Sequence, residues 1–326
     1  MAISSAGVEA ILAAEESSGG AVRISFNARY GPEMETLCAL LRQKVIGRVV
    51  SADFCEFLDL VHGADYFRRW HRRKENSGGL LMHKASHHFD QLNWLIGADP
   101  TTVHCFGGLG FYGPVREGGG RCLTCPQKGD CEFYLDLASD PGLKALYLNA
   151  ETEDSYFRDR CVFDGEIDIE DTVVANIRYS NGVLVNYSLN AFSPFEGQRI
   201  GFNGTKGRIE LDLTWRRPIP VAGGAPDHGE EDTIPHVVHV VPSRGGAYQV
   251  PLERREGTHG GADSRIREHL FREDVPDPLG QRAGSRAGAM STLVGAAGNL
   301  SILTGQAVRL SELLSNGEAL CQIGAK

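Results

Sequence analysis

The chain has 326 residues, of which 41% are hydrophobic and 23% charged, as is typical of a soluble globular protein with one or two domains. Lysine and arginine number 33 against 42 aspartates and glutamates, so the net charge is −9 and we expect no nucleic-acid partner. No apolar run reaches the roughly 18 to 20 residues that span a bilayer, and the first residues lack the basic region of a signal peptide. We therefore expect a cytoplasmic protein with no membrane partner.

Helical and strand patterns alternate over the first hundred residues. Apolar residues at helical spacing predict a helix from Gly7 to Glu16, and Val22–Phe26 alternates as a buried strand does. The helices expected next cover Glu33–Arg42 and Leu80–Ile96, and the strands Arg48–Leu58 and Thr101–Phe106.

The middle of the chain reads as an insertion followed by antiparallel strands. Residues 112–170 lack a clear period and are too long for a plain connection. Asn181-Gly182 predicts a type I′ hairpin turn between two alternating segments. The other elements expected here are a strand pair at Arg199–Asn203 and Arg208–Leu213, and helices at Ile266–Phe271 and Ala287–Leu303.

Residues 108–113 match the G-x-G-x-x-G pattern of a dinucleotide site. That pattern places pyrophosphate at the N-terminus of a helix, yet Pro114 to Gly120 has no helical periodicity. We therefore reject a phosphate role for it.

Three cysteines cluster at Cys122, Cys125 and Cys131, and Cys161 follows 30 residues after the last of them. Paired thiolates two residues apart can chelate one ion, and a fourth thiolate would complete a tetrahedron and staple the insertion. A structural zinc site is the preferred interpretation. An iron–sulfur cluster and four unligated cysteines stay open as alternatives.

A second group of candidate residues lies on the helix that follows Gly78-Gly79. His83 and His87 are four residues apart on one helical face, with Lys84 and His88 on the adjoining stripe. Imidazoles and an amine beside an apolar face favour proton transfer, although any one of these histidines could be a hydrogen-bonded structural residue.

Just upstream lies a stretch that mixes aromatic rings with guanidinium groups. This composition suits binding of a polyol, and a solvated loop is the alternative interpretation. The candidate substrate-binding residues there are Tyr66, Arg68, Trp70 and His71.

The same helix carries a family resemblance. The run Gly78-Gly79-Leu80-Leu81 through His87-His88-Phe89-Asp90-Gln91-Leu92-Asn93-Trp94 to Gly97 resembles the central signature of the Gfo/Idh/MocA family of oxidoreductases. Segments 203–210 and 304–310 resemble that family's late hairpin and closing segment, so the similarity covers nearly the whole chain.

The resemblance implies an NAD(P)-dependent oxidoreductase acting on a sugar or polyol, with an α/β (α+β) fold whose large, mainly antiparallel open sheet is covered by helices on one face and often forms the oligomer interface. His87 matches the family's catalytic histidine. His83 stands where the family often has an aspartate, and Lys84 could supply charge nearby. His88, Arg158 and Asp159 join the candidate substrate contacts.

The family's cofactor loop and its Glu-Lys-Pro segment are absent from this sequence. Residues 1–30 are therefore expected to be a remnant of a Rossmann domain with no cofactor-binding residues. Residues 31–326 form the substrate and oligomerisation domain. Two alternatives stay open: a cofactor-independent lyase, epimerase or hydratase using the histidine-rich helix, and a non-catalytic partner of a full-length homologue.

Overall fold

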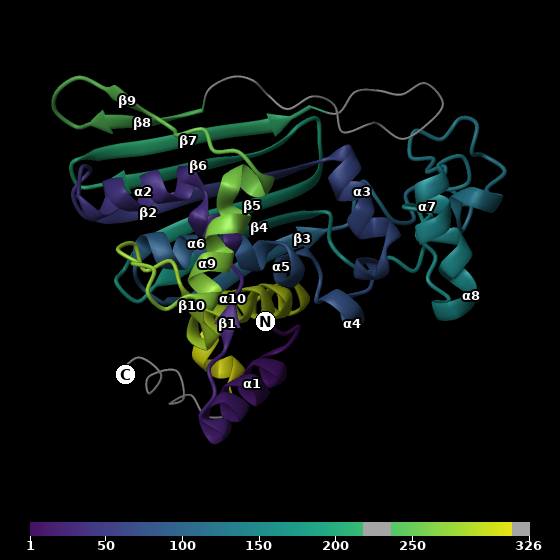
Figure 1. The fold of residues 1–326 in the computed structure, drawn as a ribbon, viewed down its shortest axis with the longest axis horizontal. Coiled ribbons are helices and arrows are strands. Elements are labelled where there is room, and N and C mark those ends of the chain that lie inside the picture. The colour runs from purple at the N-terminus through teal and green to yellow at the C-terminus, as the bar shows by residue number, and fades with distance from the viewer. Residues whose placement is uncertain (218–235, 315–326) are drawn as a thin grey trace.

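The computed structural model describes residues 1–217 and 236–314. Helices cover one face of a large sheet (Figure 1). Within the described residues the sheet has nine strands in the order β11-β3-β4-β5-β2-β6-β7-β8-β9, and β1 and β10 form a separate pair. The strands are β1 (Arg23–Ile24), β2 (Val49–Asp59), β3 (Pro100–Gly108), β4 (Thr172–Tyr179), β5 (Leu184–Ser193), β6 (Glu196–Gly204), β7 (Gly207–Arg216), β8 (Val237–Pro242), β9 (Tyr248–Pro251), β10 (Ala283–Gly284) and β11 (Val308–Arg309).

The helices lie mostly on the covered face of that sheet. Those described are α1 (Ser5–Ser18), α2 (Pro32–Arg42), α3 (Leu60–Arg68), α4 (Lys74–Ser77), α5 (Leu80–His83), α6 (Ala85–Ile96), α7 (Pro141–Leu146), α8 (Glu151–Asp154), α9 (Ala262–Phe271) and α10 (Ser285–Thr304). None of these helices is long and apolar enough to cross a membrane. The expected fold class, an open and mainly antiparallel sheet with helices on one face, is confirmed.

Strand β2 lies at the centre of the sheet. The sequence predicted this strand and the later antiparallel pairs, but not their order in the sheet. Strand β2 pairs in parallel with β5 and antiparallel with β6, so it separates the two predicted hairpins β4–β5 and β6–β7. Ala52, Phe54, Glu56 and Leu58 on this strand are all buried, because alternate side chains point toward the covering helices. This pattern carries one carboxylate, Glu56, into the core.

The hairpin at Asn181-Gly182 is present, but the turn differs from the type I′ prediction. Gly182 has φ 84°, whereas Ser180 and Asn181 keep negative φ. The N–H of Gly182 donates to the carbonyl of Tyr179 at 3.0 Å, and that of Tyr179 donates to Val183 at 2.9 Å. This is a type I turn followed by a left-handed glycine, the arrangement of a three-residue hairpin loop, because only the glycine has to adopt positive φ.

The predicted helix over Leu80–Ile96 is two helices, α5 and α6, that meet at Lys84. Helix α10 packs across both of them and against β3. Its small residues make this close contact possible: a Cβ atom on Gly295 would lie 2.6 Å from the carbonyl oxygen of Leu81. The glycine-rich helix near the C-terminus is therefore fixed by its packing on the histidine-rich one.

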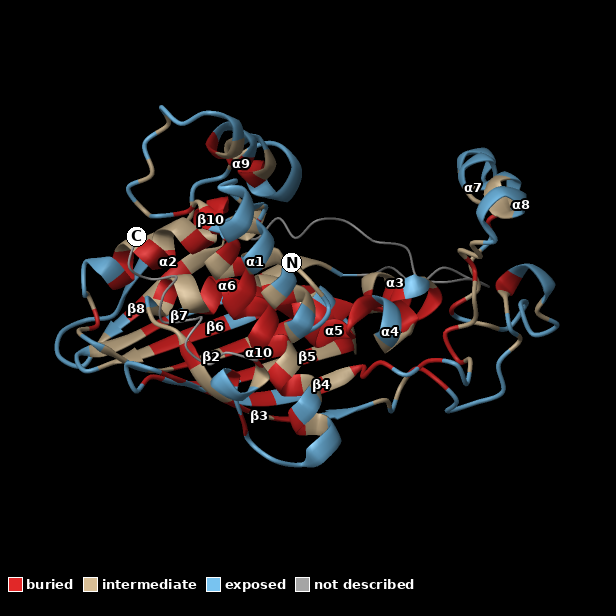
Figure 2. Cartoon of the chain, turned by 90° about the horizontal axis from the view of Figure 1, so that it is seen from below, coloured by how far each residue is buried: buried red, intermediate tan, exposed pale blue. Residues whose placement is uncertain are grey.

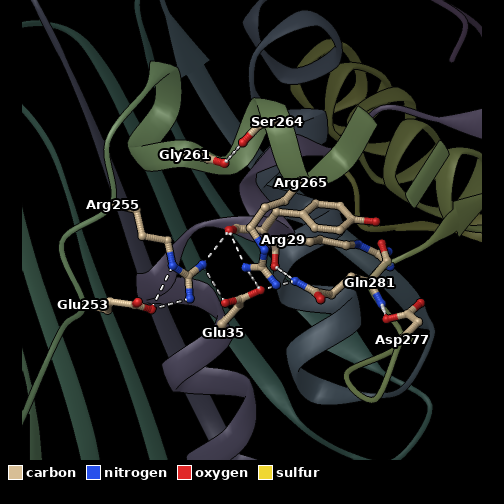
Figure 3. Close-up of polar contacts among 10 residues, drawn as sticks. Arg29, Glu35, Glu253, Arg255, Gly261, Ser264, Arg265, Asp277 and Gln281 are labelled. Atoms are coloured by element: carbon tan, nitrogen blue, oxygen red, sulfur yellow. Dashed lines mark hydrogen bonds and ion pairs between the residues drawn. The ribbon is translucent and has the colours of Figure 1, made fainter. Parts of the chain in front are cut away.

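A cluster centred on Glu35, at the N-terminal end of α2, joins the segment around α9 to α2 (Figure 3). Glu35 forms ion pairs with Arg265 and, at 2.9 Å, with Arg255, and accepts a hydrogen bond of 2.7 Å from the amide of Gln281. The same amide nitrogen donates to the carbonyl of Arg29 at 2.7 Å. We call Glu35, Arg255, Arg265 and Gln281 the Glu35 cluster.

The residues between β3 and β4 stand away from the sheet, beside α3 (Figure 1). Helices α7 and α8 in this insertion have no buried residue and are mostly exposed in Figure 2. An isolated bridge pairs Arg121, in the first part of the insertion, with Arg160, in its last part. The chain between these two residues therefore forms a closed loop.

Candidate functional site

Glu56 is a deeply buried acidic group near the histidine-rich helix, with a relative exposure of 1%. Its carboxylate lies 3.4 Å from Lys84 Nζ and 3.3 Å from His88 Nε2, and accepts a hydrogen bond of 2.8 Å from the amide of Gln198. Burial acts to raise the pKa of Glu56, but His88 and Lys84 outweigh it and lower that pKa to about 2. Glu56 is therefore ionised; we call these four residues the Glu56 cluster.

Lys84 lies between this carboxylate and the more exposed histidines. Burial acts to lower its pKa, but Glu56, Tyr66 and Glu196 outweigh burial and raise it. Lys84 is therefore a fixed ammonium group at the turn between α5 and α6. His88 is 2% exposed and joins Glu56 to the hydroxyl of Tyr187, 2.9 Å from its Nδ1. His88 is therefore a buried residue that holds Glu56 in place. Contact between His88 and a substrate stays a prediction.

Helix α3 brings a second imidazole–carboxylate pair to the same area. Asp59 caps the helix by accepting hydrogen bonds from the N–H groups of Val61 and His62 at 2.9 and 2.7 Å. His62 Nδ1 lies 2.7 Å from Glu196, and its Nε2 lies 3.2 Å from the hydroxyl of Tyr66. Tyr66 is thereby connected through His62 to Glu196.

Gly63 sets the position of α3. A Cβ atom on it would lie only 1.7 Å from the carbonyl oxygen of Ala191 on β5, so the helix approaches the sheet closely there. The close approach fixes where His62 and Tyr66 stand relative to β2 and β6.

Aromatic and imidazole rings pack together beside Lys84. His71 stacks on Trp70 with centroids 3.9 Å apart and lies 4.2 Å from the ring of His83, whose other neighbours are Tyr66 and Trp70 at 5.6 Å each. Burial and the nearby His83 lower the pKa of His71 to about 3. Burial, Lys84 and Arg69 also lower the pKa of His83. Both rings are uncharged at neutral pH.

His87, the predicted proton-transfer residue, is half-buried on α6 with the ring of Phe26 edge-on to it at 5.7 Å. Burial, and then the neighbouring His88, Lys84 and His83, lower its pKa to about 4. A neutral imidazole beside a permanent ammonium group can accept a proton from a hydroxyl whose developing charge the ammonium stabilises.

The predicted site residues fall into two groups in space. The structure gathers His83, Lys84, Tyr66, Trp70 and His71 by direct ring or charge contacts, with His87 electrostatically coupled to them. The remaining predicted residues, Arg68, Arg158 and Asp159, have their charged groups engaged with the insertion or with α3.

Arg68 donates to Cys122 Sγ at 3.4 Å and to the carbonyl of Phe133. Arg158 makes a forked pair with Asp65 at 2.8 and 2.7 Å. Asp159 faces Arg121 at 2.8 Å and accepts from the N–H of Leu123 at 2.7 Å. These contacts hold the insertion against α3, and substrate contact remains a prediction for these three residues.

Cys122, Cys125, Cys131 and Cys161 line one small cavity in the insertion. Within residues 1–217 and 236–314, no group of three or more histidine, cysteine or acidic side chains already has the arrangement of a metal site. The zinc and iron–sulfur interpretations therefore remain predictions for these thiols.

The rejection of the G-x-G-x-x-G pattern has a structural basis. Residues 109–113 follow β3 without a helix, and one carboxylate oxygen of Asp171 accepts the N–H groups of Gly110, Phe111 and Tyr112 at 3.0, 2.7 and 3.0 Å. The backbone donors that a phosphate would need are already used by a protein anion.

Sequence reasoning missed Glu56, His62 and Glu196. Glu56 carried a usable signal, because it alternates with Ala52, Phe54 and Leu58 and so falls on the buried face of a strand, where a carboxylate requires a partner. Asp59 is the N-cap of α3, a helix that the sequence analysis did not predict. Glu196 has no local signal, since its pairing with His62 depends on the position of β6.

Comparison with known proteins agrees with this fold. The family model described as "Oxidoreductase family, C-terminal alpha/beta domain" (Gfo/Idh/MocA) matches residues 39–310. A Bacillus subtilis (strain 168) protein named "Putative oxidoreductase YteT" is 38% identical over 302 residues, which cover 87% of this chain and 68% of that protein.

Two solved structures share the fold at low identity. An NAD binding oxidoreductase from Klebsiella pneumoniae has a TM-score of 0.62 at 12% identity, covering 95% of this chain and 71% of that one. An aldose-aldose oxidoreductase from Caulobacter crescentus complexed with glycerol has a TM-score of 0.59 at 13% identity, covering 95% and 70%. With the family match over most of its length and the 38% identical relative, the chain belongs to the Gfo/Idh/MocA oxidoreductase family.

Proposed function

We propose that this chain binds a sugar or polyol and moves the proton of one hydroxyl group in an NAD(P)-dependent oxidoreductase reaction, with His87 as the proton-transfer residue. The observation that carries the proposal is the pairing of a neutral His87, whose pKa is lowered to about 4, with a charged Lys84 held by Glu56. Oxidation of an alcohol requires a group that accepts the hydroxyl proton, and this pair supplies an acceptor and a stabilising charge.

The substrate class is supported by the rings and donors around this pair. The hydroxyl of Tyr66, the imidazole of His83 and the Lys84 ammonium group can hydrogen-bond several hydroxyl groups, while Trp70, 42% exposed, offers a ring face. The glycerol complex of the Caulobacter crescentus enzyme, a relative in fold, agrees with a polyol ligand.

The nicotinamide cofactor would supply hydride acceptance or donation when it is bound. Residues 110–112 do not fit its pyrophosphate group, because the backbone donors of Gly110, Phe111 and Tyr112 are taken by Asp171. The steps assigned here to this chain are therefore limited to binding the polyol, orienting one hydroxyl and accepting its proton.

The experiment is a panel of aldoses, inositols and linear polyols, each incubated with NAD⁺ or NADP⁺, with nicotinamide reduction and ligand-detected NMR as separate readouts. We expect His87→Ala to lower kcat by about 10²- to 10⁴-fold while polyol binding stays within a few-fold of wild type. His239→Gln, on β8 of the sheet, is the control and should leave both readouts unchanged. Full turnover by His87→Ala would remove His87 from the reaction.

A second candidate is a cofactor-independent lyase, epimerase or hydratase. The Glu56 cluster and His87 favour it, since proton abstraction beside a carbonyl needs only a base and a cation that stabilises the enolate. Product formation from the same panel without added nucleotide would select this candidate. Polyol binding and turnover both absent would instead favour a non-catalytic partner.

We also propose that the uncovered face of the sheet pairs with a second copy of the chain. Phe106 and Val174 are cross-strand neighbours on this face and are 63% and 41% exposed. Adjacent exposed apolar side chains of this kind mark contact surfaces. Light scattering should show an oligomer that Phe106→Glu converts to a smaller species.

A further inference from the structure

We propose that Cys122, Cys125, Cys131 and Cys161 bind a single thiophilic metal ion of the zinc class, which fixes the insertion against α3. This site lies outside the proposed proton-transfer machinery. The first observation is that the four sulfur-bearing residues, which span 40 positions of the chain, line the same small cavity.

The backbone explains why Cys161 joins the other three. The bridge between Arg121 and Arg160 is flanked by two further hydrogen bonds, from Cys161 N–H to the carbonyl of Gly120 at 2.9 Å and from Cys122 N–H to that of Asp159 at 2.8 Å. These bonds lay the segment carrying Cys161 alongside the segment carrying Cys122. A ligand that is distant in sequence is thus delivered by main-chain pairing.

Donors already point at three of the sulfur atoms. Cys122 Sγ lies 3.4 Å from both the N–H of Leu135 and the guanidinium of Arg68, and Cys161 Sγ lies 3.4 Å from the N–H of Phe163. Arg116 Nη2 lies 3.7 Å from Cys131 Sγ. Such donors stabilise negative charge on sulfur, which a thiol acquires when it releases its proton to solvent and binds a metal ion.

Gly119, just before the cysteine cluster, packs closely against the fourth sulfur atom, that of Cys125. A Cβ atom on Gly119 would lie 2.3 Å from Cys125 Sγ, so a larger residue there would displace this sulfur from the cavity. Gly119 is therefore required by its close approach to Cys125, whereas a Cβ atom on Gly120 would meet no atom within 4 Å and that glycine is required by its φ of 71°.

A metal ion would act on the outer part of the insertion, because the part next to the sheet already buries Phe133, Val162 and Phe163. Helices α7 and α8 bury no side chain, and four unbridged thiols leave the insertion without a covalent link. Since the described residues do not already have the arrangement of a bound site, ion binding must draw the sulfur atoms together, as in small domains whose metal binding is coupled to folding. Arg68, the last residue of α3, would carry this ordering to the helix that holds His62 and Tyr66.

The test is a metal analysis of the whole chain purified without chelators and under reducing conditions. We expect about one zinc ion per chain. We expect Cys161→Ser to lose most of that metal, whereas Cys55→Ser, a half-buried thiol on β2 outside the cavity, retains it. A wild-type protein with no bound zinc that also fails to bind added zinc would overturn the proposal.

Because Cys161→Ser may unfold the insertion, a second measurement uses the wild-type chain alone. After chelation and dialysis, titration with Co²⁺ should give the visible absorption of tetrahedral cobalt bound by thiolates, saturating at one ion per chain and reversed by zinc. The same chelation should make four further thiols accessible to a thiol reagent. Iron with acid-labile sulfide, or disulfides among these cysteines in the freshly purified protein, would each contradict a single-ion site.

Discussion

Glu56 and Glu35 are surrounded by similar sets of partners, one amide donor and two cationic or imidazole side chains, but the two clusters differ in what those partners can do. The partners of Glu35 are Arg255 and Arg265, and arginine stays charged over the whole accessible pH range. The partners of Glu56 are a lysine and an imidazole, and the lysine also lowers the pKa of the neighbouring His83 and His87.

The residues that surround the Glu35 cluster and the Glu56 cluster also differ. The Glu35 cluster joins α2 to the α9 segment through main-chain and side-chain contacts (Figure 3). The Glu56 cluster borders uncharged histidines, His83 and His87, whose pKa values are lowered by burial and by Lys84. A buried carboxylate with two cations is therefore insufficient to identify a functional site; the titrating neighbours distinguish one cluster from the other.

The largest expected effect comes from neutralising Glu56. Glu56→Gln leaves the ammonium group of Lys84 buried without its carboxylate, so we expect the free energy of unfolding at neutral pH to fall by about 3–5 kcal/mol. Urea denaturation measures this loss. Glu35→Gln is the matched control, and its loss should be smaller, about 1–2 kcal/mol, because the Glu35 side chain is 12% exposed whereas that of Glu56 is fully buried, and the cations that remain are 24% and 34% exposed against 20% for Lys84. Equal losses of unfolding free energy in the two variants would contradict the difference inferred between the Glu56 and Glu35 clusters.

A rescue experiment sharpens the same point. Adding Lys84→Met to Glu56→Gln removes the uncompensated charge, so we expect about 1–3 kcal/mol of the unfolding free energy to return. The same urea denaturation applies, and a further loss in the double variant would show that Lys84 is stabilised by groups other than Glu56.

The pH dependence of stability tests the state of His87. Its folded pKa of about 4 lies below the unfolded value of about 6.5, so between these values the unfolded chain binds the extra proton and stability rises with pH. His87→Gln should therefore flatten the slope in this window, by at most about 1.4 kcal/mol per pH unit. Unfolding measured from pH 4.5 to 7 gives the slope, with His239→Gln as the unchanged control. An unaltered slope would mean that His87 is protonated like a free histidine.

The smallest effect on stability is expected from conservative exchanges of the cations. Lys84→Arg and Arg265→Lys both keep the charge, and each should change the free energy of unfolding by less than about 1 kcal/mol. They should differ in polyol binding, which Lys84→Arg weakens because a planar guanidinium replaces a compact ammonium group, and which Arg265→Lys leaves unchanged. Ligand-detected NMR on both variants gives the answer.

Local patterns predicted much of this fold. Helices α1, α2 and α10 and the hairpins β4–β5 and β6–β7 follow from periodicity and turn residues, which act over a few positions. The candidate site was only half predictable. His83, Lys84 and His87 lie within five residues across the junction of α5 and α6, so their proximity follows from their closeness in the sequence.

By itself, the sequence determined which chemical groups this protein carries, which of them share a helix, and the family to which it belongs. The tertiary structure decided which distant groups meet: Glu56 with Lys84, Glu196 with His62, and Cys161 with Cys122. These contacts depend on the position of β2 between β5 and β6 and on the bridge between Arg121 and Arg160 in the insertion. Strand order and long-range pairing are set by the free energy of packing the whole chain, which no local window of sequence contains.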